Sequence, residues 1–123
     1  MKDIYRLQRG VALPGQGDSH SWGHLNIFVD HATMEVSGVT AGRVRINVGH
    51  SNPLHVHDNC DEIIVLLTGE IDQVVGEASV RMSPGDVVVI PARIPHHARS
   101  IGAVDADMII TYNSDDRLYR LVE

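Results

Sequence analysis

Residues 49–69 read GHSNPLHVHDNCDEIIVLLTG and place His55, His57 and Glu62 next to an apolar run. His55 and His57 stand on either side of Val56, and residues two apart point to the same face of an extended chain. Both imidazoles can therefore point toward one place. Glu62 begins the apolar run 62–67, where burying a carboxylate is costly unless a partner offsets its charge. A divalent cation would be such a partner, so this stretch predicts a metal site at the end of a strand.

The residues on both sides of this stretch predict an all-β protein. The chain has 16 Val and 11 Ile against 8 Leu, and Gly, Pro, Asn and Asp interrupt the apolar runs about every eight to twelve residues. Short strands at that spacing are typical of a sandwich or a barrel. The predicted strands cover residues 26–30, 34–39, 42–48, 62–67, 71–75, 78–82, 87–90 and 107–112.

The connections between these strands contain recognisable turn residues. Gly76-Glu77 and the Ser-Pro-Gly-Asp sequence of residues 83–86 predict tight turns, because glycine takes positive φ values and proline fixes φ. The run 87–90 is apolar at every position, which favours a strand buried on both faces. Residues 15–23 are rich in glycine and polar side chains and predict a mobile loop. The only helical patterns are short and cover residues 4–9 and 115–121.

A second pair of histidines, His96 and His97, follows the proline-bounded segment 91–95. Neighbouring residues of an extended chain point to opposite faces. We therefore expect His96 to point into the interior. His97 is expected at the surface or beside the metal ligands, and the alternative is a proton shuttle at the mouth of a barrel.

The two histidine-containing stretches resemble the motifs of a known family. Residues 49–69 follow the pattern Gly49-x5-His55-x-His57-x4-Glu62-x6-Gly69, which resembles the first cupin motif at every fixed position. The resemblance implies a single cupin domain over residues 1–123, with the all-β barrel known as a jelly roll or double-stranded β-helix.

The second motif is less complete. Residues 85–100 resemble the second cupin motif at Gly85, Pro91 and His96. Arg93 stands where the family pattern has Gly, and Ser100 stands where it has Asn. Neither departure removes a metal ligand, so we expect them to affect the shape of the local loop.

The cupin resemblance implies that one metal ion is bound by His55, His57, Glu62 and His96. Three neutral imidazoles and one carboxylate suit a divalent transition metal that keeps one or two open positions. Iron, manganese, zinc, nickel and cobalt all fit this set of ligands, and the sequence does not choose among them.

Composition narrows the class of partners. The 10 Lys+Arg and 16 Asp+Glu give a net charge of −6, and the basic residues are scattered, which argues against nucleic acid. No apolar run approaches the roughly 18 residues of a membrane-spanning helix, and residues 1–15 lack the apolar core of a signal peptide. The single cysteine, Cys60, cannot form an internal disulfide. We therefore expect a cytoplasmic protein with a small-molecule ligand and with neither a nucleic-acid nor a membrane partner.

Further side chains are candidates for roles near the metal. Arg43, Arg45 and Asn47 share one face of the strand 42–48. If that face lines a cavity, Arg45 can bind a substrate carboxylate or phosphate; the alternative is a sheet surface that faces solvent. Tyr112 either points its hydroxyl into the cavity or belongs to the core. The candidates for a catalytic general base are His97, Asp61 and Tyr112.

Two functions fit these residues. The first is a metal-dependent enzyme that acts on a small oxygen-rich molecule by isomerase, decarboxylase, cyclase or dioxygenase chemistry. The alternative is a non-catalytic cupin that binds a metal together with a sugar or an organic acid. Unpaired sheet edges and an apolar face in so small a barrel favour a homodimer.

Overall fold

Eleven strands and no helix make up the regular structure of residues 4–123, which are the residues that the computed structural model describes. All strand pairs are antiparallel. Within this part of the chain no helix is long and apolar enough to cross a membrane. In chain order the strands are β1 (Asp18–His20), β2 (Gly23–Val29), β3 (Thr40–Ile46), β4 (His55–Val56), β5 (Glu62–Thr68), β6 (Ile71–Val75), β7 (Ala78–Met82), β8 (Val87–Ile90), β9 (His96–Ser100), β10 (Ala106–Tyr112) and β11 (Arg120–Leu121).

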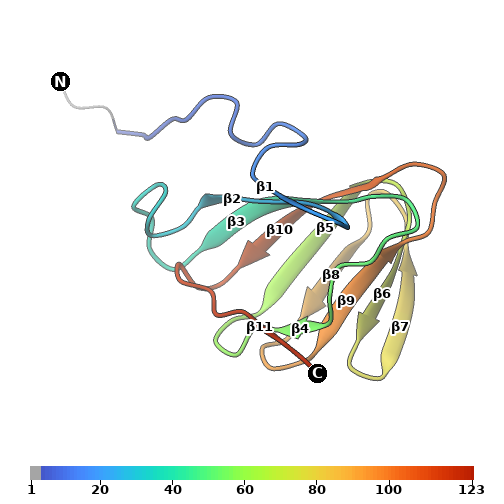
Figure 1. Cartoon of the computed structure of the whole chain (residues 1–123). Coiled ribbons are helices and arrows are strands. Elements are labelled where there is room, and N and C mark those ends of the chain that lie inside the picture. Colours follow the sequence, from blue (N-terminus) through green and yellow to red (C-terminus); the bar gives the residue numbers. More distant parts are fainter. Residues whose placement is uncertain (1–3) are drawn as a thin grey trace.

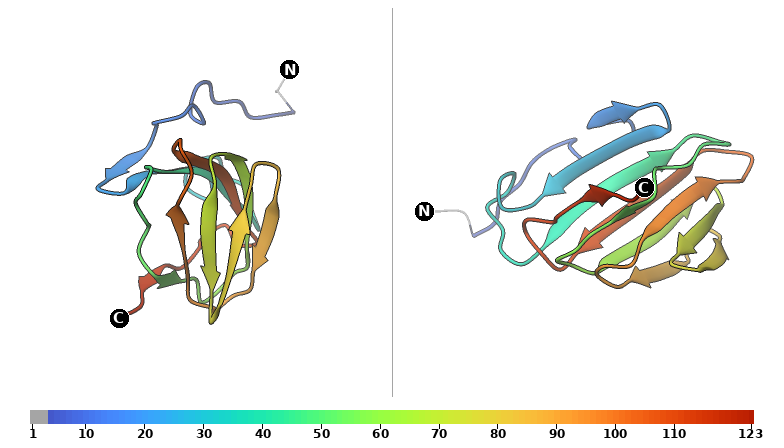
Figure 2. Two further views of the ribbon diagram at one scale, coloured as in Figure 1. Left: turned by 90° about the vertical axis from the view of Figure 1, so that its right-hand side faces the viewer. Right: turned by 60° about the horizontal axis from the view of Figure 1, so that its bottom comes forward.

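The strands form two sheets that face each other. The six-stranded sheet has the order β1-β2-β3-β10-β5-β8, and the five-stranded sheet has the order β11-β4-β9-β6-β7. Figure 1 shows the two sheets enclosing a common interior, with the irregular residues 4–17 lying outside it. The second view in Figure 2 shows the strands of both sheets running side by side. The chain thus forms the jelly-roll barrel that the sequence predicts.

The interior is filled by alternate residues of the long strands. In β3 and β10 every second residue is buried, and the first half of β5 follows the same pattern. This alternation is the period of an extended strand with one face toward a core. The largest of these buried apolar side chains are Ile46, Leu66, Met108 and Ile110.

Most predicted strands are present. β6, β7 and β8 have the predicted bounds, and β5 and β10 differ from the prediction by one residue. The strands β4, β9 and β11 were not predicted. β4 begins with His55, β9 begins with His96 and His97, and β11 lies in the segment 115–121, where the predicted helix is wrong. The helix expected at residues 4–9 is also absent from the described residues.

Two predictions near the N-terminal half are wrong. Residues 34–39 do not form a strand, because a turn covers residues 31–34 and the chain is irregular from 35 to 39. Asp30 Oδ1 accepts the backbone N–H groups of Ala32 and Thr33 and closes this turn. Glu35 then takes a φ of 53°, which interrupts an extended chain. Residues 15–23 are also not a simple loop, because β1 lies within them and pairs with β2.

The strand β8 is not buried on both faces. It lies at the edge of the six-stranded sheet, and Val87 and Val89 are each 58% exposed. Their side chains point away from the interior because only alternate residues of a strand can face it. The continuous apolar run therefore marks an exposed apolar sheet face.

Candidate metal centre

A cavity of about 400 Å³ lies between the two sheets. The inward-facing residues of β2, β3, β5 and β10 form one side of it, and residues of β4, β6 and β9 form the other. His55, His57, Glu62 and His96 all border this cavity. Each of the four side chains is buried, so the cluster is shielded from bulk water.

The fold brings the four side chains together from three strands. His55 begins β4 and pairs directly with His96, which begins β9. His57 follows β4 at the position two residues on, so its ring returns to the same face. Glu62 begins β5 in phase with the buried residues of that strand. One nitrogen or oxygen atom from each of the four residues lies within 4.8 Å of the others.

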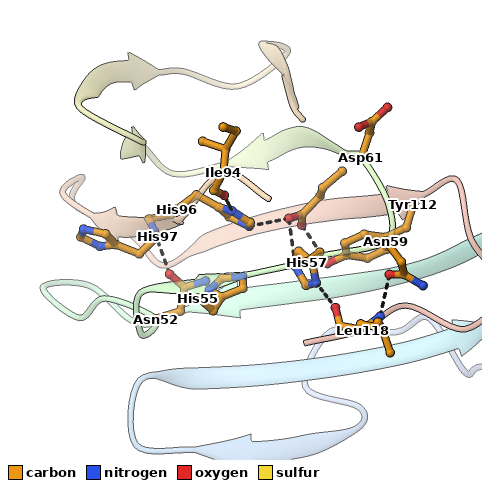
Figure 3. Close-up of polar contacts among 12 residues, drawn as sticks. Asn52, His55, His57, Asn59, Asp61, Ile94, His96, His97, Tyr112 and Leu118 are labelled. Carbon is orange, nitrogen blue, oxygen red and sulfur yellow. Dashed lines mark hydrogen bonds and ion pairs between the residues drawn. The ribbon is translucent and has the colours of Figure 1, made fainter. Parts of the chain in front are cut away.

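Each imidazole is held by a backbone carbonyl behind it. The Nδ1 atoms lie 2.7 Å from Pro53 O for His55, 2.7 Å from Leu118 O for His57 and 2.9 Å from Ile94 O for His96. A carbonyl oxygen only accepts, so Nδ1 carries the proton in all three rings and donates it. In a neutral ring tethered in this way Nε2 carries the lone pair, on the side of the ring away from its carbonyl partner (Figure 3).

The contacts of His57 Nε2 and His96 Nε2 fit a bound cation. His57 Nε2 is buried without a hydrogen-bond partner among the described residues, and it lies 3.6 Å from Glu62 Oε1. His96 Nε2 lies 2.9 Å from the same oxygen. A neutral ring that donates through Nδ1 has no proton for this oxygen, so the contact requires an imidazolium or a cation in its place. A divalent metal satisfies both nitrogens and the carboxylate together, as metal-bound histidines with a tethered second nitrogen do.

The surroundings of His55 and Glu62 lower the pKa of both side chains. Burial, helped by the nearby His96, lowers the pKa of His55 to about 4. Burial alone would raise the pKa of Glu62, but the rings of His57 and His96 outweigh it and hold this pKa at about 2. Both side chains are therefore unprotonated near neutral pH, which is the form that binds a metal.

Tyr112 contacts the cluster through Glu62. Its hydroxyl donates to Glu62 Oε2 at 2.8 Å, and the two residues are opposite each other on β10 and β5. Burial and the negative charge of Glu62 raise the pKa of Tyr112 well above 10. The hydroxyl therefore keeps its proton near neutral pH and orients the Glu62 carboxylate.

Three other predicted candidates lie away from the cluster. His97 is on the opposite face of β9, where its Nδ1 is 3.1 Å from Ser51 Oγ, and Figure 3 shows it turned away from His96. Arg45 faces outward from β3 and forms an ion pair with Asp105. Neither residue lines the cavity. His97 is therefore not placed for its predicted catalytic role, nor Arg45 for its predicted substrate-binding role. The reason in both cases is that the neighbouring residue on the strand takes the inward position.

The Asp61 carboxylate is also engaged in hydrogen bonds outside the cluster. Its Oδ1 accepts the backbone N–H of Ala92, and its Oδ2 accepts from the side chain of Asn113. The carboxylate ties three loops together and points away from the cluster (Figure 3). Asp61 is therefore not placed to act as a general base at the candidate metal centre.

The structure adds residues to the site that sequence reasoning missed. Gln73 on β6 and Arg117 after β10 both border the cavity. No local pattern distinguishes Gln73 or Arg117, because Gln73 is an ordinary polar residue of a strand and Arg117 lies in the segment where a short helix was predicted. Gln73 reaches the cavity because β6 pairs with β9, and Arg117 reaches it because the chain after β10 runs back past the cavity.

Arg93, which departs from the second motif, adopts the backbone conformation of a glycine. Arg93 has a φ of 69°, a conformation that glycine takes at little cost and other residues rarely adopt. Its backbone N–H donates to His57 O at 2.9 Å. The loop therefore keeps the conformation of a glycine position and holds the chain beside a metal-ligand candidate.

Comparisons with known proteins agree with this geometry. The family model of the cupin domain matches residues 42–112. Germin-like protein 3-5 of Oryza sativa subsp. japonica is 30% identical over 87 residues, which cover 64% of this chain and 38% of that protein. Oxalate oxidase 2 of Hordeum vulgare is 29% identical over 87 residues, which cover 64% of this chain and 39% of that protein. The chain thus matches well under half the length of these relatives.

A solved structure of oxalate oxidase shares the fold. It superimposes with a TM-score of 0.83 at 22% sequence identity, covering 94% of this chain and 63% of that one. The match to the cupin domain extends over more than half of the 123 residues. Together with the two facing sheets and the buried histidine and glutamate side chains, it shows that this chain belongs to the cupin family.

Proposed function

We propose that this protein is a metal-dependent cupin enzyme that acts on a small oxygen-rich molecule. In this proposal one divalent transition metal is bound by His55, His57, Glu62 and His96. The observation that carries it is the convergence of three histidine side chains, each tethered through Nδ1, and one buried carboxylate within 4.8 Å of one another at the edge of a cavity. Iron, manganese, zinc, nickel and cobalt are all compatible with these ligands.

The surrounding residues prepare the site for chemistry on an oxygen-rich ligand. The backbone carbonyls of Pro53, Leu118 and Ile94 fix the three rings, and Tyr112 fixes the carboxylate. A bound divalent metal with open positions supplies charge stabilisation to ligand oxygens that become more negative during reaction. The apolar walls of the cavity strengthen this effect, because charges interact more strongly beside apolar groups than in bulk water.

The comparisons favour a carboxylic acid as the substrate class. Relatives of this chain include oxalate oxidase, whose name gives oxalate as its substrate. Isomerase, decarboxylase, cyclase and dioxygenase reactions all use a metal that holds ligand oxygens, and fold alone does not select among them.

The test combines metal analysis with a substrate screen. Purified protein is analysed for bound metals and then mixed under air with oxalate, enolisable keto acids, sugar phosphates and catechols. Glu62→Gln is expected to lose both metal and turnover, whereas Glu77→Gln, which changes an exposed turn residue, is expected to retain both. Wild-type protein that binds no transition metal, or Glu62→Gln protein with full metal content, contradicts the proposal.

A second candidate function is a non-catalytic cupin that binds a metal and an organic acid or a sugar. One observation favours it: none of the predicted general bases is available, because His97 and Asp61 lie away from the cavity and Tyr112 keeps its proton. A full metal site with no turnover in the screen supports this candidate over the enzyme.

We also propose that two copies associate through the outer face of the six-stranded sheet. Ile63 and Val89 are opposite each other on β5 and β8, and they are 41% and 58% exposed. Val87 and Leu67 extend this apolar face along the same strands. Covering it removes apolar surface from water and protects an unpaired sheet edge. A cytoplasmic location stays a prediction from the sequence, which has one cysteine and shows neither a signal-peptide pattern nor an apolar run long enough to span a membrane.

A further inference from the structure

Gln73 on β6 is a buried amide with one unsatisfied atom. Its Nε2 donates to the carbonyl oxygen of His97 at 3.0 Å and to that of Val74 at 3.3 Å. Both partners can only accept, so the orientation of the amide is determined. Its Oε1 is buried with no hydrogen-bond partner among the described residues. Because a buried acceptor without a donor is costly, Gln73 is prepared for a ligand that carries an N–H or O–H group.

The amide of Gln73 lies one layer of side chains away from the four metal-ligand candidates. Gln73 pairs with Ala98, which is two residues beyond His96 on β9. In the other sheet Ile64 is two residues beyond Glu62 on β5. Since His96 contacts Glu62, the next inward-facing residues of both sheets form the next layer of the cavity. A ligand held at the cluster can therefore reach Gln73 with its far end.

The remaining walls of the cavity are apolar in this direction. The cavity volume of about 400 Å³ lies within the range of roughly 300–1,000 Å³ that is typical of pockets for drug-sized ligands. A two-carbon acid would leave most of it empty. The apolar side chains that border it come from β2, β3, β5 and β10 and are Leu25, Ile27, Val44, Ile64, Met108 and Ile110.

A single guanidinium borders the same cavity near the end of β10. Arg117 packs over the rings of Tyr112 and Tyr119, with Cζ at 5.3 Å and 5.8 Å from their centres. It forms no ion pair with any residue of the described part of the chain. Asp30 and Asp116 also border the cavity, and Asp30 is occupied in closing its turn. Arg117 is thus a positioned cation with its charge available to an anionic ligand.

We infer that the cavity binds a carboxylic acid with an apolar body and a hydrogen-bond donor at its far end, such as an aromatic hydroxy acid. Arg117 binds the carboxylate of the ligand next to the four metal-ligand candidates. The apolar walls hold the apolar body of the ligand, and Gln73 Oε1 accepts a hydrogen bond from the donor at its far end. This inference rests on the proposed function for the site beside it, and it names the class of substrate. Gln73 and Arg117 are specificity-determining residues in this arrangement.

The first test compares ligands on the wild-type protein by calorimetry. The probes are the ortho, meta and para isomers of hydroxyphenylpropanoate, phenylpropanoate without the hydroxyl, para-ethylphenol without the carboxylate, and oxalate. One hydroxylated isomer is expected to bind about 5-fold tighter than phenylpropanoate, as one hydrogen bond predicts. Oxalate is expected to bind at least tenfold more weakly. Oxalate that binds as tightly as the aromatic acids, or no isomer better than phenylpropanoate, overturns the inference.

The second test changes the protein. Arg117→Gln is expected to weaken the aromatic acids by about tenfold, as loss of a charge-assisted contact predicts, and to leave para-ethylphenol unchanged. Arg120→Gln is the matched control, because Arg120 pairs with Asp58 and does not border the cavity. Gln73→Met is expected to abolish the advantage of the hydroxylated isomer. If Gln73→Met protein does not fold, the ligand comparison on the wild-type protein still decides.

Titrations of metal-loaded and metal-free protein separate the two proposals. Binding of the hydroxylated acid to a protein that takes up no transition metal refutes the proposed function and supports this inference. A protein with full metal content that prefers oxalate refutes this inference and leaves the proposed function standing. Equal binding to wild-type and Arg117→Gln protein overturns the role of Arg117 in either case.

Discussion

Replacing Tyr112 with phenylalanine tests whether a residue outside the four ligand candidates holds Glu62 in place. The Tyr112 hydroxyl donates to Glu62 Oε2 at 2.8 Å, and both side chains are buried. Tyr112→Phe removes this donor and keeps the ring that packs beside His57. The carboxylate then has a buried oxygen without its hydrogen bond.

Two independent routes give a similar magnitude for this change. A hydrogen bond to a charged group contributes about 1.5–3 kcal/mol. Removing the hydrogen-bond partner of a metal ligand typically lowers metal affinity by about 10–100-fold, which corresponds to roughly 1.4–2.7 kcal/mol. We therefore expect the metal dissociation constant to rise by at least tenfold in Tyr112→Phe.

The measurement is a competition titration of metal against a chelator at neutral pH. Tyr119→Phe is the matched control, because Tyr119 borders the same cavity and its ring packs beside His55, while its hydroxyl forms no hydrogen bond with the described residues. The control should bind metal as the wild type does. A Tyr112→Phe affinity within twofold of wild type would refute the idea that this hydroxyl positions the ligand.

Three other predictions concern stability and assembly. The metal-free chain should lose stability as the pH falls from about 6.5 toward 4, because burial lowers the pKa of His55 from 6.5 to about 4 and the unfolded chain takes up the proton first; a constant urea midpoint contradicts this. Arg93→Gly should raise the unfolding free energy by about 1 kcal/mol, because it relieves the positive φ; a lower melting temperature argues against this. Val89→Lys should give monomers by light scattering, whereas Val80→Lys on the other sheet should leave dimers. Wild-type protein that is monomeric at micromolar concentration overturns the proposed dimer.

Local patterns predicted the strands that tight turns separate and missed β4, β9 and β11. β6, β7 and β8 were predicted with their bounds because tight turns separate apolar runs of extended chain. β4 has only two residues and consists of His55 and Val56, too short for any alternation to appear. Its strand conformation comes from pairing with β9 and β11 on either side, and that pairing depends on distant segments.

The direction of side chains was the other point that sequence alone left open. The polar face of β3 had two possible orientations, and the apolar run of β8 was wrongly predicted to be buried on both faces. Arg45 faces outward because Val44 and Ile46 fill the core, and Val87 and Val89 face outward because β8 is an edge strand whose buried residue is Ile90. Which face is buried depends on the sheet that lies opposite.

The sequence by itself determined the all-β pattern and the four metal-ligand candidates, because strand period and motif spacing are properties of a short stretch of chain. Only the tertiary structure decided that Tyr112 contacts Glu62, that His97 and Arg45 lie away from the cavity, and that Gln73 and Arg117 border it. These relations join strands that are far apart in the chain. They arise when two sheets pack face to face, since packing decides which side chains share one buried space.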